Sequence, residues 1–99
     1  MRLHIRGKNI KLTEHLREQV RTRLAFALDR FQPKIRDVTG RLSDINGDRG
    51  GVDKHCRLVV RLRPEGKVTI EETDRNVCAA VARAADRARH IVGRALKRR

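Results

Sequence analysis

Hydrophobic residues recur along this chain with two different periods, which separate expected helices from expected strands. Between positions 14 and 31, and again between 76 and 99, apolar residues fall three or four positions apart. This spacing places them on one face of an α-helix, so both segments are predicted to be amphipathic helices. The apolar positions are Leu16, Val20, Leu24, Ala27, Leu28 and Phe31 in the first helix, and Val77, Ala80, Val81, Ala84, Ala88, Ile91, Val92, Ala95 and Leu96 in the second.

Four shorter segments alternate apolar and polar residues, which is the period of a strand with one buried face. They cover residues 2–6, 35–45, 55–63 and 67–73. In the second, a bulge at Gly40 is one interpretation. The third is the clearest, with Cys56, Leu58, Val60 and Leu62 expected to point inward and His55, Arg57, Arg61 and Arg63 outward.

Capping and turn-forming residues mark where the expected helices begin and end. Thr13 is predicted to be the N-cap of the first helix, because its hydroxyl can accept from a free backbone N–H there. Pro33 is expected to end that helix, since proline interrupts the hydrogen-bond ladder. Thr73 or Asp74 is predicted to cap the second helix, and residues 46–54, with three glycines, are expected to form a loop.

The expected order of elements is therefore β-α-β-β-β-α. With one apolar face per element, this order predicts an α+β two-layer sandwich, a four-stranded sheet with both helices on one face. The last three strands are expected to form an antiparallel meander, and the first to pair in parallel because the chain returns through a helix. Two domains would each be too small for a core, so residues 1–99 are expected to form a single domain.

The composition is strongly basic, with 25 Lys and Arg against 12 Asp and Glu and a formal net charge of +13. Such a charge favours nucleic acid or an anionic membrane as partner. The alanine-rich apolar face of the second helix is a poor membrane anchor, so no membrane partner is expected. Cys56 and Cys78 fall at apolar positions and do not resemble a disulfide framework. Since the chain begins without an apolar run of signal length, a cytoplasmic location is expected.

The second helix carries its basic residues away from its apolar face. Residues 75–99 contain eight Lys or Arg and one acid, so they hold +7 of the total charge. A merely soluble helix would mix signs, so this stripe is interpreted as a nucleic-acid contact. The stripe comprises Arg83, Arg87, His90, Arg94 and Lys97 or Arg98.

Other basic residues are open to both a binding and a solubility interpretation. In the first helix Arg17 and Arg21, and before it Lys8 and Lys11, would extend the contact, although acids in that helix weaken the signal. Outward arginines of the strands are expected on the helix-free face, where edge protection and solubility are slightly favoured over binding. These are Arg57, Arg61 and Arg63, with Arg2, Arg6 and Arg41 beside them.

No catalytic, metal or cofactor motif is present. The segment from Asp44 to Asp48 is similar to the start of a calcium loop, but Arg49 stands where such a loop needs glycine and His55 where it needs glutamate. His55 and Cys56 lack a second pair at zinc-ligand spacing. With two Phe, no Tyr and no Trp, recognition of RNA phosphates and shape is expected instead of base stacking. We expect no enzyme activity, no cofactor and no small-molecule substrate.

Two stretches of the chain resemble a known family. The first is Ile5-Arg6-Gly7-Lys8 with Thr13 and the leucine-rich helix that follows; the second is Ala79-Ala80-Val81 followed by Asp86, Arg87 and Arg94. Together they resemble the ribosome hibernation promoting factors, also called ribosome-associated inhibitors or subunit-interface proteins. Cys78, Ala82 and His90 replace the family's tyrosine, aspartate and arginine, as in a divergent member. Because the chain ends at Arg99, it is similar to the short form.

The resemblance implies a non-enzymatic factor that responds to stress. It would bind the small ribosomal subunit through rRNA, occupy the channel of messenger and transfer RNA, and inhibit translation during ribosome hibernation. The predicted RNA-binding residues are Arg83, Arg87, Arg94, Lys97 and Arg98, followed by His90, Arg17, Arg21, Lys8 and Lys11. Only Arg87, His90 and Arg94 correspond to the family motif. The alternatives are a general RNA-binding module of the double-stranded-RNA-binding type and a basic regulator that docks an acidic protein.

Overall fold

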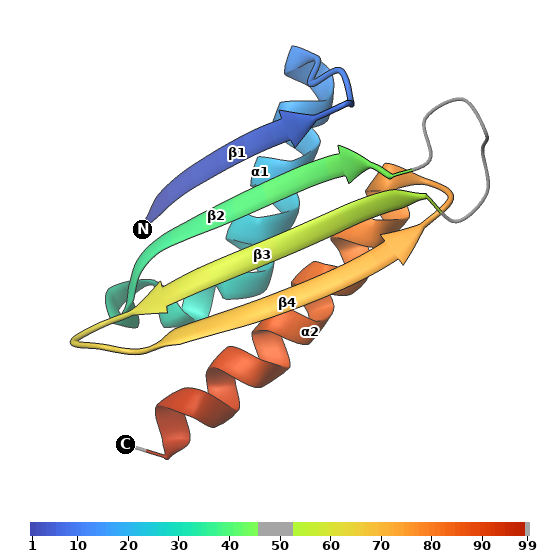
Figure 1. Ribbon diagram of the computed structural model, residues 1–99. Helices are drawn as coiled ribbons and strands as arrows, with labels where there is room; N and C mark the ends of the chain where they lie inside the picture. The colour runs from blue at the N-terminus through green and yellow to red at the C-terminus, as the bar shows by residue number, and fades with distance from the viewer. Residues whose placement is uncertain (46–52, 99) are drawn as a thin grey trace.

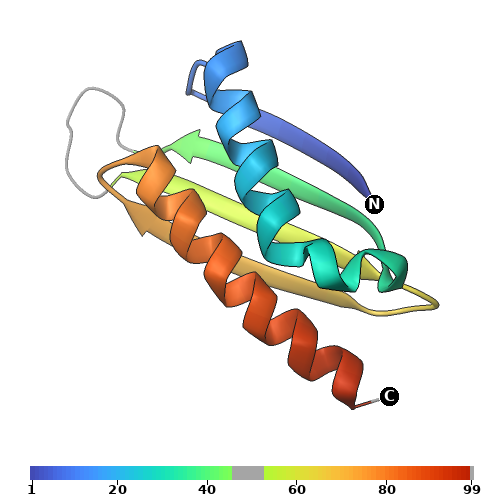
Figure 2. The same ribbon diagram turned by 180° about the vertical axis from the view of Figure 1, so that it is seen from behind.

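A four-stranded sheet forms one layer of the structure, and two helices cover one of its faces (Figures 1 and 2). This computed structural model describes residues 1–45 and 53–98. The order β-α-β-β-β-α and the two layers confirm the predicted α+β fold. The elements are β1 (Arg2–Lys8), α1 (Glu14–Leu28), the 3₁₀ helix η1 (Asp29–Lys34), β2 (Ile35–Asp44), β3 (Lys54–Leu62), β4 (Lys67–Asp74) and α2 (Val77–Lys97).

The strands lie in the order β1-β2-β3-β4, with β1 parallel to β2 and the other neighbours antiparallel. This confirms the expected meander and the parallel first strand. The predicted bulge at Gly40 is wrong, since Gly40 pairs regularly with Ile5 and Leu58 and the register shift lies between Ile35 and Asp37. A Cβ atom at residue 40 would lie 3.4 Å from a methyl of Leu58, an ordinary van der Waals distance.

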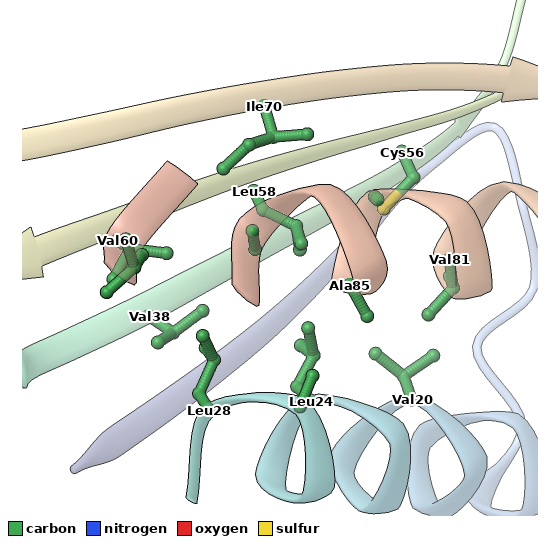
Figure 3. Close-up of a cluster of buried hydrophobic side chains, with 14 of the residues drawn as sticks. Val20, Leu24, Leu28, Val38, Cys56, Leu58, Val60, Ile70, Val81 and Ala85 are labelled. Atoms are coloured by element: carbon green, nitrogen blue, oxygen red, sulfur yellow. The ribbon is translucent and has the colours of Figure 1, made fainter. Parts of the chain in front are cut away.

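The core lies between the sheet and the helices (Figure 3). Leu24 and Leu28 of α1 and Leu58 and Ile70 of the sheet are all fully buried in this core. The buried face of α2 is mostly alanine, whose small side chains permit a close approach to the sheet. The inward set predicted for β3 is confirmed, because Cys56, Leu58, Val60 and Leu62 are all buried.

The start of α1 is as predicted, but its end is not. The hydroxyl of Thr13 accepts from the N–H of Leu16 at 3.1 Å, which is the expected N-cap. The α-helix stops at Leu28, and Asp29–Lys34 continues as a 3₁₀ helix that includes Pro33. Proline has no N–H to bond the carbonyl four residues earlier, so the chain leaves the α-conformation a turn before it.

The predicted cap of α2 at Thr73 or Asp74 is wrong. Asn76 is the N-cap, and its side-chain oxygen accepts from the N–H groups of Cys78 at 2.7 Å and Ala79 at 3.2 Å. The reason is that β4 stays paired with β3 as far as Asp74, so the helix begins later. Asp74 instead accepts from the N–H of Asn76 at 3.0 Å and shapes the turn between strand and helix.

Candidate nucleic-acid interface

The basic stripe of α2 lies on the exposed side of the helix, opposite its buried alanines. Its six side chains are all exposed, and spacings of three and four keep them on one side of the helix. They are Arg83, Arg87, His90, Arg94, Lys97 and Arg98. The stripe therefore exists as a surface feature, but its two ends differ in their surroundings.

The first two arginines of the stripe, Arg83 and Arg87, are bound to β4; we call them the edge arginines. Arg87 Nη1 lies 2.5 Å from Glu72 Oε2, and Arg83 Nε lies 3.3 Å from Glu72 Oε1. Arg83 Nη1 also lies 3.6 Å from Asp74 Oδ2. Both arginines donate to backbone carbonyls as well, Arg83 to Thr73 and Arg87 to Glu71. They therefore cover the outer edge of β4, an edge strand whose backbone groups would otherwise be unpaired there.

The rest of the stripe has no such partners. We name four of its residues the α2 terminal cluster: His90, Arg94, Lys97 and Arg98. Their side chains make no ion pair or hydrogen bond within residues 1–45 and 53–98. The cluster occupies the last turns of the helix at its exposed side. Its positive charge is not neutralised by any described residue, so it remains available to an external anion.

The basic residues near the N-terminus are not brought to this cluster. α1 and α2 run in the same direction, because Cys78 lies beside Gln19 and Gly93 lies beside Phe31 (Figure 2). Lys8 ends β1 and precedes α1, so it lies at the opposite end of the molecule from the last turns of α2. The molecule is 44 Å along its longest axis. The predicted residues therefore form two separate groups.

The N-terminal group consists of Lys8, Lys11, Arg17 and Arg21. The two lysines and the two arginines have different surroundings. Lys8 and Lys11 are exposed and make no ion pair within the described part of the chain. Arg17 is half-buried and donates to the backbone carbonyl of Ile5 at 3.0 Å, which holds α1 against β1. Arg21 lies 3.0 Å from Glu18, one turn earlier on the same helix. Lys8 and Lys11 are thus the cations of this group most accessible to a ligand.

The helix-free face of the sheet is basic, and one of its acids is tightly held. Asp37 of β2 is 6% exposed, and both of its oxygens accept from the guanidinium of Arg61, with Nε at 2.8 Å from Oδ1. This hydrogen bonding holds the pKa of Asp37 below its ordinary value, although burial acts in the opposite direction. The same contact raises the pKa of Arg61. The register also places Arg2 beside Asp37 and Lys67 beside Arg61. The carboxylate of Asp37 thus offsets one positive charge at this end of the face.

An exposed aromatic side chain lies on α1, which the helical pattern did not single out. Phe26 is 81% exposed and falls outside the apolar stripe of its helix. It borders a groove between α1 and α2, together with Arg23, Val20 and Val81. The sequence signal was an aromatic residue at a position that the helical period predicts to be polar.

No group of three or more His, Cys, Asp or Glu side chains within residues 1–45 and 53–98 is arranged to hold a metal ion. The expected loop and the segment similar to a calcium loop lie largely at residues 46–52, outside the described residues. Beside them, Lys54 lies 3.1 Å from Asp44 and 2.9 Å from the buried Asp53, and these hydrogen bonds raise the pKa of Lys54. Burial raises the pKa of the Cys56 thiol to about 12, so it stays protonated.

The sequence matches a family of known proteins along nearly its whole length. The family model for the sigma 54 modulation protein / S30EA ribosomal protein matches residues 3–99. The chain belongs to this family. This is the hibernation factor family that the two stretches of sequence resemble, so the family predicted from the sequence is confirmed. The family consists of ribosome-associated interface proteins, which are not known enzymes.

Two solved structures share the fold of this family member. The N-terminal domain of Protein Y from Thermus thermophilus is 32% identical, with a TM-score of 0.78 over 95% of this chain and 98% of that one. A ribosomal subunit interface protein from Coxiella burnetii is 15% identical, with a TM-score of 0.80 over 98% of this chain and 99% of that one. No curated protein sequence matches the chain significantly. Among the described residues, no helix has the length and apolar character needed to span a bilayer.

Proposed function

We propose that this protein binds the small ribosomal subunit, occupies the channel used by messenger and transfer RNA, and inhibits translation as a hibernation factor of the cytoplasm. The family supports ribosome association, and the Coxiella relative is named as a ribosomal subunit interface protein. The observation that carries the proposal for this chain is the α2 terminal cluster, whose cations lack partners within the described residues. Unpaired cations on one side of a helix match the phosphates of folded RNA.

The proposed mechanism is steric, and electrostatic attraction provides the affinity. Arg94, Lys97 and Arg98 would each displace counterions from rRNA phosphates, and the release of those ions would drive binding. The two layers of the protein would then fill space that transfer and messenger RNA require. The cations of the N-terminal group, Lys8 and Lys11, would meet a separate stretch of RNA, because they lie at the other end of the molecule.

The experiment is cosedimentation with purified 30S and 70S particles at several salt concentrations. The variant Arg94→Gln/Lys97→Gln/Arg98→Gln removes three positive charges from the proposed contact. The control Arg23→Gln/Lys34→Gln/Arg75→Gln removes three charges from exposed positions outside it, none of which is ion-paired within the described part of the chain.

Wild type and control should sediment with the particles at low salt and inhibit cell-free translation. For the α2 variant, the slope of log affinity against log salt should fall by about 2 to 3, as expected for three lost phosphate contacts. Circular dichroism would verify that all three proteins are folded. A folded wild-type protein that stays at the top of the gradient would reject the proposal, as would equal binding to ribosomes and to a simple RNA duplex.

A further inference from the structure

The helix-free face of the sheet carries a row of three arginines on three neighbouring strands. The strand register places Arg6 of β1 beside Arg41 of β2, and Arg41 beside Arg57 of β3. All three side chains are exposed. They make no ion pair or hydrogen bond with any residue in 1–45 or 53–98. We call these three residues the arginine row.

Protein stability alone does not account for this row. Neighbouring strands lie about 4.8 Å apart, so the backbones that carry these three like charges lie within about 10 Å of one another. Like charges directly opposite one another across strands destabilise a sheet. At the other end of the same face Asp37 lies between Arg2 and Arg61, so an acid separates those two arginines, and Lys67 follows beside Arg61. In the arginine row the corresponding central position holds a third cation, Arg41.

The sequence slightly favours edge protection and solubility over binding, and edge protection does not explain the row. The strand order is β1-β2-β3-β4, so Arg41 and Arg57 lie on the two central strands. Both edges of those strands are already paired. The nearest acid, Glu71, is paired with Arg57 in the strand register, but its carboxylate lies 3.0 Å from His55 Nε2. No described acid is therefore ion-paired with the row, and its three cations remain available to an external anion.

The surrounding surface indicates which anion fits. Beside the arginine row the register places His4, Thr39, Val59 and Thr69, of which only Val59 is apolar. Of these residues, His4, Thr39 and Val59 line a hollow together with Arg41 and Arg57 of the row. The same hollow extends to Asp37, Arg61 and Lys67. A protein partner would usually meet an apolar centre with aromatic side chains, which this face lacks. A polar surface that carries three arginines on neighbouring strands matches the phosphates of an RNA backbone.

We propose that the arginine row is a second contact for RNA phosphates, on the opposite layer of the protein from the α2 terminal cluster. This inference rests on the proposed function and extends it. A protein that lies on the surface of an RNA needs one cationic face. A protein inserted into a channel meets phosphates on both sides, and this chain presents unpaired cations on both its sheet layer and its helix layer.

The test uses the variant Arg6→Gln/Arg41→Gln/Arg57→Gln beside the wild type and the matched control Arg23→Gln/Lys34→Gln/Arg75→Gln. Affinity for purified 30S subunits is measured as a function of salt. The slope of log affinity against log salt should fall by about 2 to 3 for the arginine-row variant and by less than about 1 for the control. Melting temperature is a second readout. It should stay equal or rise in the arginine-row variant, since the substitutions remove repulsion between strands.

The outcomes separate this inference from the function on which it rests. If wild type does not bind 30S subunits, the proposed function fails. If wild type binds and the arginine-row variant keeps the slope of the control, the second contact is refuted and the function stands. A lowered melting temperature with an unchanged slope would show a structural role and also refute it. Binding by the row that persists after the RNA is digested would mean an acidic protein partner, and would overturn the assignment to RNA.

Discussion

Arg87 of α2 and Glu72 of β4 form an ion pair, with 2.5 Å between Nη1 and Oε2. Glu72 also contacts Arg83 at 3.3 Å, so a single carboxylate holds both edge arginines. Two arginines of the basic stripe are therefore bound to β4, and the other four residues of the stripe form no ion pair among the described residues. Two of the predicted RNA-binding residues therefore have a structural partner, and their role in RNA binding becomes a separate question.

The substitution Glu72→Gln tests that question, because it removes the shared carboxylate and leaves both edge arginines in place. Exposed ion pairs contribute little, so the free energy of unfolding should fall by no more than about 1 kcal/mol. If the edge arginines face RNA, the salt slope of 30S binding should become steeper by about 1 to 2. An unchanged slope would place Arg83 and Arg87 outside the RNA contact. Glu65→Gln, an exposed acid in the turn between β3 and β4, is the matched control.

The pair of Asp37 and Arg61 predicts a loss of stability in acid. Since the native pKa of Asp37 is lowered, its contribution is present above the ordinary carboxyl pKa near 4. That contribution is lost as the pH falls through the lower, native pKa. Urea unfolding between pH 6 and pH 2 should therefore show a smaller acid-induced loss for Asp37→Asn than for wild type. Asp86→Asn, at an exposed site on α2, should behave as wild type; parallel curves for wild type and Asp37→Asn would contradict the prediction.

Two neighbouring residues of α1 should differ sharply in their effect on stability. Leu24 is 0% exposed, so Leu24→Ala should lower the free energy of unfolding by about 2 to 5 kcal/mol through lost burial and a cavity. Phe26 is exposed, and Phe26→Ala should change it by no more than about 0.5 kcal/mol. Chemical denaturation measures both. A large loss for Phe26→Ala would mean that this ring is covered in solution.

The observed cap of α2 can be distinguished from the predicted one by two alanine substitutions. Asn76→Ala removes the acceptor for two backbone N–H groups and should cost about 1 kcal/mol. Thr73→Ala should lower the free energy of unfolding by less. The hydrogen bond from Arg83 goes to the backbone carbonyl of Thr73, which alanine keeps. Thermal unfolding of the two variants, compared with wild type, tests the assignment. Equal losses would count against Asn76 as the sole cap.

Periodicity was sufficient for the layers of the fold and insufficient for the details at element ends. The inward residues of β3 follow from alternation alone, and the parallel pairing of β1 follows from the intervening helix. The cap of α2 was misplaced because β4 remains paired to Asp74, and strand pairing is a tertiary property. The end of α1 was misplaced because a 3₁₀ turn that contains Pro33 follows the α-helix.

The candidate site was predicted less well because its electrostatics depend on tertiary contacts. α2 has one acid of its own. The carboxylates that pair with the edge arginines, Glu72 and Asp74, come from β4, a different element. The separation of Lys8 from the α2 terminal cluster depends on the parallel course of the two helices. The arginine row depends on strand order and on register to within one residue. Without the strand order and the register, the sequence pattern cannot show whether these arginines lie on central strands or on edge strands.

The two cysteines of the chain differ in a way that permits site-specific labelling without mutagenesis. Cys56 is fully buried and its pKa is raised to about 12, so a maleimide dye should not react with it in the folded protein. Cys78 is exposed at the start of α2, beside Gln19. A fluorophore attached there would lie on the helix layer, away from both the arginine row and the last turns of α2. The native chain thus provides its own optical reporter for docking measurements.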